Sequence, residues 1–258
     1  MKNTKNNELA VCGFAAVKTL EKNNWQRIKR LYFSEEKAPL FGGLCKKLSS
    51  VKRPYNQVKN VSELEKLCGS IHHQGVVAMI EMPEILPLNS DITESWVKKN
   101  ESAVLLDRVG NANNLGAIVR SAAFFGIKNI VIPNDEAQSS ITTSSYRVAE
   151  GGMEFVNVYS IKSIPHLLED MKGRMIRIGT SLEAKKTVRD IKNICQSKGA
   201  LVVLGNEEHG ISDQVKNNCD ELVIIPFSGM NKNFSAPKVD SLNVAQAASI
   251  ILYELSGV

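Results

Sequence analysis

Short apolar runs of strand length, alternating with helical patterns, constrain the fold of this chain more than any other feature. The segments 103–106, 201–204 and 222–225 are continuously apolar. Helical patterns lie between and after them, at 115–125 and at 241–255, and further strands are expected at 129–132, 153–158 and 175–179. Strands that are apolar on both sides must be covered on both faces, which is typical of parallel sheets with crossover helices. The sequence therefore predicts an α/β fold over 101–258.

The first part of the chain predicts a smaller α/β domain of its own. A helical pattern runs from Leu9 to Asn24, and strands are then expected at 28–33, 55–58 and 75–80, with helices at 41–48 and 61–68 between them. Residues 82–91 contain two prolines and show no periodicity, which favours a linker. The predicted organisation is a flexible tail at 1–8, a first domain at 9–82, a linker at 83–100 and a second domain at 101–258.

The charge of the chain is distributed unevenly between these two parts. Residues 1–100 carry 16 Lys and Arg against 10 Asp and Glu, whereas the rest of the chain carries 16 against 17. A basic first domain joined to a near-neutral second domain indicates contact with a polyanion such as a nucleic acid. A solvated surface that favours lysine is the alternative explanation.

Cysteine and histidine usage predicts neither disulfides nor a metal. The five cysteines are scattered, no C-x-x-C pair occurs, and no histidine lies at metal-ligand spacing. No apolar run approaches the ~20 residues of a membrane-spanning helix, and no signal peptide pattern is present. We therefore expect a cytoplasmic protein with reduced thiols, without a membrane or metal partner.

Several common catalytic signatures are missing from the sequence. It contains no G-x-G-x-x-G after a strand, no P-loop, no G-x-S-x-G and no H-E-x-x-H. Three polar segments remain, at 107–120, 204–212 and 225–243, and each follows the carboxyl end of a predicted strand. Open α/β sheets bind their ligands at that end. These segments are the candidates for a functional site.

Each of the three segments also has a purely structural interpretation. Arg120 can be a solvated residue on a helix, and it lies six residues after Asn114, so the two do not share a helix face. The adjacent carboxylates Glu207 and Glu208 can form a solvated acidic turn, in which at most one points inward. Ser241 and Asn243 can be helix-capping groups.

The order of these segments resembles the three motifs of the SpoU (TrmH) branch of the SPOUT RNA methyltransferases. The matching residues are N-N-L-G-A-I-V-R-S-A at 113–122, L-G-N-E-E-H-G-I-S at 204–212, and I-P at 225–226 with S-L-N-V-A at 241–245. The first domain is similar to the ribosomal-protein-like substrate-binding domain of this family, with V-C-G-F-A-A-V at 11–17 and H-Q-G-V-V-A at 73–78.

This resemblance implies a fold, a reaction and a set of residues. The fold is a parallel sheet with a trefoil knot near the C-terminus, and the protein is a homodimer. The reaction is transfer of a methyl group from S-adenosylmethionine to a ribose 2′-hydroxyl of tRNA or rRNA. The resemblance assigns cofactor binding to Thr180, Gly205, Ile225 and Leu242. It assigns catalysis and substrate positioning to Asn114, Arg120, Glu207, Ser241 and Asn243.

The role of Arg120 has two versions. The family proposal makes the arginine a general base, but a guanidinium rarely loses its proton. Bidentate binding of an adjacent phosphate is the other role that suits this side chain. The sequence also departs from the pattern of the family it resembles at a long loop, 227–240, at Ala149-Glu150-Gly151-Gly152 and at Glu208-His209.

The basic residues of the first domain cluster around one predicted loop. We expect RNA phosphates to be bound there, with a strong dependence on salt, by Lys46, Lys47, Lys52 and Arg53. An RNA-binding protein that keeps the fold without methyl transfer is the main alternative function, and transfer to a base rather than a ribose is another.

Overall fold

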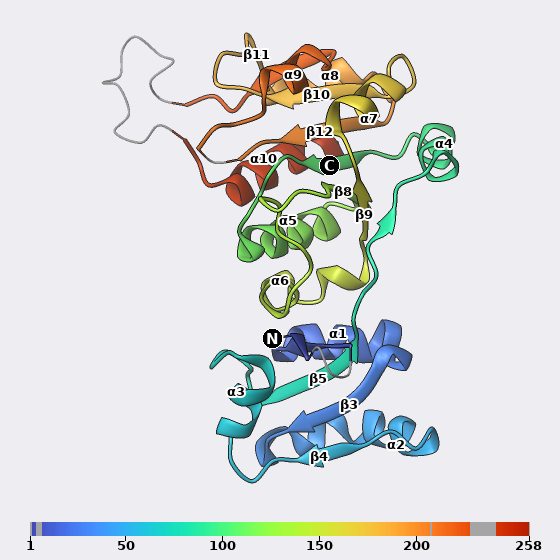
Figure 1. Cartoon of the computed structure of the whole chain (residues 1–258), viewed down its shortest axis with the longest axis vertical. Coiled ribbons are helices and arrows are strands. Elements are labelled where there is room, and N and C mark those ends of the chain that lie inside the picture. Colours follow the sequence, from blue (N-terminus) through green and yellow to red (C-terminus); the bar gives the residue numbers. More distant parts are fainter. Residues whose placement is uncertain (1, 4–6, 207, 228–240, 258) are drawn as a thin grey trace. The chain divides into compact units, whose positions relative to one another are not determined.

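The computed structural model describes residues 2–3, 7–206, 208–227 and 241–257 (Figure 1). The chain divides into two compact units, Met1–Glu84 with Ser140–Phe155, and Ile85–Ser139 with Val156–Val258. The predicted boundary after residue 82 lies beside the break at Glu84. The first unit also includes Ser140–Phe155, from the second half of the chain, and no pattern in the sequence indicates that this segment packs there.

The first unit contains a five-stranded sheet in the order β1-β2-β5-β3-β4. Its strands are β1 (Lys2–Asn3), β2 (Glu8–Cys12), β3 (Ile28–Phe33), β4 (Tyr55–Gln57) and β5 (Val76–Glu81). Its first helices are α1 (Phe14–Asn24), α2 (Gly42–Ser50) and α3 (Ser62–Cys68), with short 3-10 turns at Trp25–Arg27 and Glu35–Phe41. The small α/β domain expected from the sequence is therefore present.

The start of the chain differs from its predicted form. Residues from Leu9 onward were expected to be helical, but Glu8–Cys12 is a fully buried strand that pairs with β5, and the helix begins only at Phe14. Gly13 separates the two elements with a φ of 97°, a conformation that favours glycine. Part of the expected flexible tail is also paired, because Lys2 and Asn3 lie opposite Leu9 and Glu8.

The segment Ser140–Phe155 packs within the first unit through α6 (Thr143–Ala149) and a 3-10 turn, Gly152–Glu154. The Arg27 guanidinium lies 3.2 Å from the Glu154 carboxylate and donates to the Tyr146 hydroxyl at 2.8 Å. Burial raises the pKa of Tyr146 to about 12. A Cβ at Gly151 would lie 2.6 Å from the Thr19 Cβ, which explains glycine in this departure from the family pattern.

The second unit contains an eight-stranded sheet in the order β11-β13-β10-β12-β7-β8-β9-β6, and every strand pair in it is parallel. The strands are β6 (Leu86–Pro87), β7 (Ala103–Leu106), β8 (Asn129–Pro133), β9 (Asn157–Ile161), β10 (Ile176–Thr180), β11 (Lys186–Thr187), β12 (Ala200–Leu204) and β13 (Glu221–Ile224). The parallel sheet predicted from the apolar runs is confirmed, and β7 and β12 are buried along their whole length.

Six helices accompany this sheet in the described part of the second unit. They are α4 (Ser90–Lys99), α5 (Ala112–Phe124), α7 (Ile164–Asp170), α8 (Ile191–Cys195), α9 (Asp213–Asn217) and α10 (Val244–Ser256), with a 3-10 turn at Val188–Asp190. The last helix, α10, lies against α5 (Figure 1). A hydrogen bond between the hydroxyls of Ser121 and Ser249, 2.8 Å apart, joins these two helices.

Much of the segment expected to be a linker is folded. Residues 86–87 extend the sheet and residues 90–99 form α4, whose Trp96 is only 3% exposed and contacts Tyr159 edge to face. Ile92, Trp96 and Val97 give this helix an apolar face that packs on the core of the second unit. The two prolines of the segment precede the helix, so they do not interrupt it. Among the described residues, no helix has the length and apolar character needed to cross a bilayer.

Candidate active site

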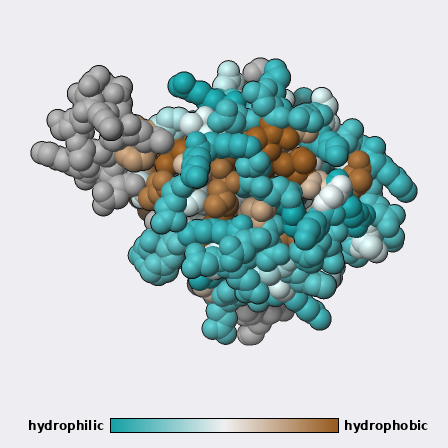
Figure 2. Space-filling model, turned by 90° about the horizontal axis from the view of Figure 1, so that it is seen from above, coloured by the Kyte–Doolittle hydropathy of each residue, from teal (hydrophilic) through white to brown (hydrophobic). Residues whose placement is uncertain are grey.

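A cavity of about 640 Å³ lies at the carboxyl ends of the strands β10, β12 and β13. This volume is within the ordinary range for small-molecule sites. All four residues predicted to bind a cofactor, Thr180, Gly205, Ile225 and Leu242, line this one cavity. The structure thus brings together residues that are up to 62 positions apart in the sequence. Hydrophobic side chains also form a band between hydrophilic ones on the face seen in Figure 2.

The walls of the cavity are mainly apolar, with a few polar groups at defined places. Apolar side chains come from the strand ends, from Ile211 and from α10. The polar lining residues include Thr180, whose hydroxyl donates to the Val203 carbonyl at 3.2 Å, and also Asn206 and Ser241. Glu183, Glu208 and Lys216 contribute charge. Such a site suits a ligand with a flat apolar part and several hydrogen-bonding groups.

Gly205 lies where the loop after β12 folds back on itself. A Cβ at this position would be 2.6 Å from the Gly210 carbonyl oxygen and closer still to the Gly210 carbonyl carbon and the Ile211 amide nitrogen. The Gly210 amide donates to the Asn206 carbonyl at 2.8 Å, and Gly210 has a φ of 63°. The backbone atoms of Gly205 and Gly210 therefore pack directly against each other at this wall of the cavity.

The acidic turn of the second motif faces both the cavity and the solvent. The side chains of Glu208 and His209 are largely exposed and lie 3.9 Å apart, and both residues line the cavity. Glu207, the predicted catalytic carboxylate of this motif, lies outside the described residues. In the part of the chain that is described, no group of three or more potential metal ligands occurs.

Two of the predicted catalytic residues are in direct contact. The Asn243 side-chain nitrogen donates to the Asn114 side-chain oxygen at 3.1 Å, across the start of α10 and the first turn of α5. The Asn243 oxygen also accepts from the Ala245 amide at 2.9 Å, so this residue caps its helix as well. Ser241 is exposed and lines the cavity. Three residues of the predicted set thus lie around the start of α10.

Arg120 is an exposed residue of α5, six residues or about 1.7 turns after Asn114. This exposed position on the helix can be reached by a large substrate. The helix that carries it is held to α10 by the contact between Ser121 and Ser249. The position of Arg120 is compatible with both of its predicted roles.

The basic cluster predicted in the first unit separates into two kinds of residue. Lys46, Lys47 and Lys52 are exposed, and the Lys47 ammonium lies 5.8 Å from the centre of the Trp25 ring. Arg53 instead donates to the backbone carbonyls of Gln26 and Ile28. The lysines are therefore accessible to a polyanion, whereas Arg53 has a structural contact that its sequence position does not reveal.

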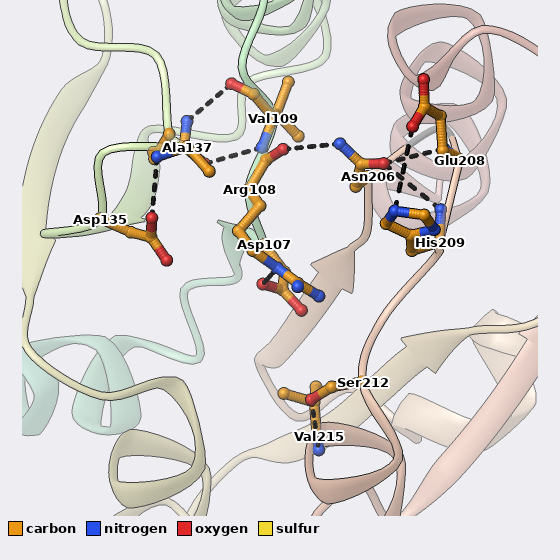
Figure 3. A network of polar contacts seen from close by, with 11 residues as sticks. Asp107, Arg108, Val109, Asp135, Ala137, Asn206, Glu208, His209, Ser212 and Val215 are labelled. Carbon is orange, nitrogen blue, oxygen red and sulfur yellow. Dashed lines mark hydrogen bonds and ion pairs between the residues drawn. The ribbon is translucent and has the colours of Figure 1, made fainter.

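Sequence reasoning gave no role to Asn206, which joins two loops of the site (Figure 3). Its side-chain nitrogen donates to the Arg108 carbonyl at 3.1 Å, and its side-chain oxygen accepts from the amides of Glu208 and His209. Arg108 is 98 positions away in the sequence. No local spacing could have indicated this contact.

Two family models together match most of the chain. The family model described as SpoU rRNA Methylase matches residues 101–253, and the model described as RNA 2′-O ribose methyltransferase substrate binding matches residues 10–86. The chain is 34% identical to the 23S rRNA (guanosine-2′-O-)-methyltransferase RlmB of Acinetobacter baylyi, over 74% of this chain and 73% of that protein. It is 28% identical to RlmB of Pseudomonas aeruginosa, over 95% and 94%.

Solved structures show the same fold across both units. The SpoU methyltransferase AviRb from Streptomyces viridochromogenes is similar with a TM-score of 0.72, at 22% identity, over 98% of this chain and 90% of that one. An rRNA methyltransferase from Sinorhizobium meliloti is similar with a TM-score of 0.72, at 20% identity, over 97% and 87%.

Proposed function

Because this chain belongs to the SpoU rRNA methylase family, we propose that it transfers the methyl group of S-adenosylmethionine to a ribose 2′-hydroxyl of ribosomal RNA. The observation that carries the proposal is the cavity that Thr180, Gly205, Ile225 and Leu242 line together. The relatives named as 23S rRNA guanosine-2′-O-methyltransferases favour ribosomal RNA over tRNA as the substrate.

The residues of the cavity fit S-adenosylmethionine. Its apolar walls suit an adenine ring, and the wall at Gly205 is formed by backbone atoms that offer hydrogen-bonding groups. The cofactor, when bound, supplies a methyl group on a positively charged sulfur, which is already activated for transfer. The protein must then align the ribose oxygen with that methyl group and assist the loss of the hydroxyl proton.

The residues around the start of α10 are suited to alignment. Asn114 and Asn243 present amide groups that can donate to and accept from ribose hydroxyls, and their mutual hydrogen bond fixes both side chains. Ser241, at the edge of the cavity, adds a hydroxyl. Glu207 enters the proposal through its motif alone, since it is outside the described residues.

Arg120 binds the phosphate next to the target ribose in this proposal. A guanidinium stays charged and makes paired hydrogen bonds to phosphate oxygens, so it fixes the sugar in one orientation. A general-base role requires a neutral guanidinium, which is rare in proteins. The two roles predict different pH dependences, because a neutral base makes the rate rise with pH up to strongly alkaline conditions.

RNA binding through the first unit is part of the proposal. The exposed lysines Lys46, Lys47 and Lys52 supply phosphate contacts, and Arg53 supports their loop through its contacts with backbone carbonyls. The match of residues 10–86 to a substrate-binding family supports this assignment.

We also propose that the protein is a cytoplasmic homodimer with the trefoil knot of its family. Phe124 is 83% exposed and Tyr253 is 50% exposed, and both contact Phe125, so an aromatic surface crosses α5 and α10. Covering such side chains with a second copy would remove a large apolar area from water. Sedimentation of the purified chain at several concentrations tests the dimer.

The experiment that tests the function compares ribose methylation across total RNA from cells with and without this protein. We expect one or a few rRNA positions to lose the 2′-O-methyl group, and the purified protein to restore them with S-adenosylmethionine. Calorimetric titration should detect cofactor binding. Unchanged methylation together with no binding at millimolar cofactor would favour the alternative, an RNA-binding protein without transfer activity. A methyl group found on a base would show that the acceptor is not the ribose hydroxyl.

A further inference from the structure

The side chain of Asn206 uses both ends of its amide, and each end holds a different part of the site. The oxygen accepts from the backbone amides of Glu208 at 2.8 Å and His209 at 3.3 Å, which shapes the turn that lines the cavity. The nitrogen donates to the Arg108 carbonyl at 3.1 Å, in the loop between β7 and α5 (Figure 3). The orientation of the amide is unambiguous, because backbone amides only donate and a carbonyl only accepts.

The Arg108 carbonyl is held in place by an uncommon backbone conformation. Arg108 has a φ of 59°, which few residues other than glycine adopt. Its side-chain Nε donates at 3.0 Å to the carboxylate of Asp107, which is 4% exposed. The second oxygen of that carboxylate has no hydrogen-bond partner among the described residues. These two unfavourable features lie beside the carbonyl that Asn206 contacts, and such features cluster where a site needs a defined geometry.

The residue after Arg108 is fixed from the other side. The Val109 amide donates to the side-chain oxygen of Gln138 at 2.9 Å, and the Gln138 nitrogen donates back to the Val109 carbonyl at 3.1 Å. The loop between β7 and α5 is thus held between side-chain amides from two other strand-end loops. Asn111, the residue that caps α5, follows two positions later.

We infer that Asn206 is a positioning residue that links the cofactor turn to the helix carrying Asn114 and Arg120. The inference rests on the proposed function. A rigid hydrogen bond between the two loops keeps the cavity and the start of α5 in one fixed relation. Methyl transfer requires the acceptor oxygen to be held in line with the donor, so loosening this relation slows the transfer more than it weakens cofactor binding.

Two substitutions separate the two ends of the amide. Asn206→Asp keeps an oxygen for the amides of Glu208 and His209 but replaces the donor to the Arg108 carbonyl with a second acceptor. Asn206→Ala removes both contacts. Asn111→Asp is the matched control, because it makes the same chemical change in the loop between β7 and α5, which Asn206 contacts, while keeping the oxygen that accepts from the Asn113 amide at 2.8 Å.

The experiment measures single-turnover methylation of ribosomal RNA from cells that lack this protein, together with the calorimetric Kd for S-adenosylmethionine. We expect Asn206→Asp to lower the transfer rate by about 10²-fold with cofactor affinity close to that of the unmodified protein. Asn206→Ala should weaken cofactor binding as well, and Asn111→Asp should change neither quantity. Combining Asn206→Asp with Arg120→Ala should cost little more than Arg120→Ala alone, because both changes affect the same step.

A second readout does not depend on activity. Hydrogen exchange of the amides at 108–113 should be faster in Asn206→Asp than in the unmodified protein, and unchanged in Asn111→Asp. If Asn206→Asp transfers methyl groups at the normal rate, or loses as much cofactor affinity as Asn206→Ala, the inference is wrong. If the unmodified protein itself transfers no methyl group, the proposed function fails instead, and the hydrogen-exchange comparison still decides whether Asn206 holds the loop.

Discussion

Substituting Gly205 by alanine should damage the cofactor cavity specifically. The new Cβ would lie 2.6 Å from the Gly210 carbonyl oxygen, against 3.4 Å or more for an ordinary contact, and two other backbone atoms would be closer still. The turn that carries them is held by the Gly210–Asn206 backbone bond, so it must move by about 1 Å as a unit. Overpacking of this kind costs about 1–3 kcal/mol.

If the substitution destabilises the loop conformation that binds cofactor by this amount, Gly205→Ala should raise the Kd for S-adenosylmethionine about 5- to 150-fold. Calorimetric titration measures this directly, and the melting temperature without cofactor reports how much of the cost falls on the fold. Gly43→Ala is the control, because a Cβ at Gly43 meets no atom within 4 Å and lies in a helix, where alanine is preferred to glycine. Cofactor affinity equal to that of the unmodified protein would refute the assignment of this wall of the cavity.

Three further predictions concern catalysis, RNA binding and acid stability. Arg120→Ala should lower the single-turnover rate about 10²–10³-fold while leaving the melting temperature unchanged, because the side chain is exposed; a small loss would exclude Arg120 from the reaction. Neutralising the three exposed lysines, Lys46, Lys47 and Lys52, should reduce the slope of log K against log salt in filter-binding assays by about 2. An unchanged slope would show that these lysines do not contact RNA phosphates. The Arg177 guanidinium holds the pKa of Asp220 below its ordinary value of 3.8, so this pair stabilises the fold above pH 3.8 and the stabilisation is lost as the pH falls further. Asp220→Asn should remove that acid dependence and cost about 1–2 kcal/mol at neutral pH, measured by urea unfolding, because the buried Arg177 loses a charged partner that is itself partly exposed.

The parallel sheet was predictable because its central strands are buried on both faces. The runs at 103–106 and 201–204 carry only apolar residues, and they form β7 and β12 with every residue buried. Elements with a mixed environment were harder to predict. Glu8–Cys12 is a strand that begins with a charged residue, and its pairing with β5 outweighs the helical pattern that follows it.

The folded part of the expected linker shows a different limit of the sequence. Proline favours an irregular segment, but Pro87 lies in the edge strand β6, which ends before α4 begins. The apolar face of α4 spans only Ile92, Trp96 and Val97, which is too short for a periodicity to stand out. Its burial depends on Tyr159, far away in the sequence, so only the folded chain reveals it.

In the candidate site too, features set by nearby residues were predictable from the sequence, and contacts between distant residues were not. Gly205, Ile225 and Leu242 were predicted because each belongs to a short motif, whereas Thr180 ends a strand outside these motifs. The sheet then brings the carboxyl ends of its strands to one edge. The side-chain contacts that join one motif to another could not be predicted from the motifs themselves. The contact of Asn206 with Arg108 joins residues 98 positions apart, and that of Asn243 with Asn114 joins residues 129 positions apart. Both contacts use side-chain amides, which can bind two partners at once and so can serve a local turn and a distant loop together. Asparagine is common in turns, so its presence at position 206 is already accounted for by the local turn. The sequence therefore gives no sign that the same side chain also binds a second loop.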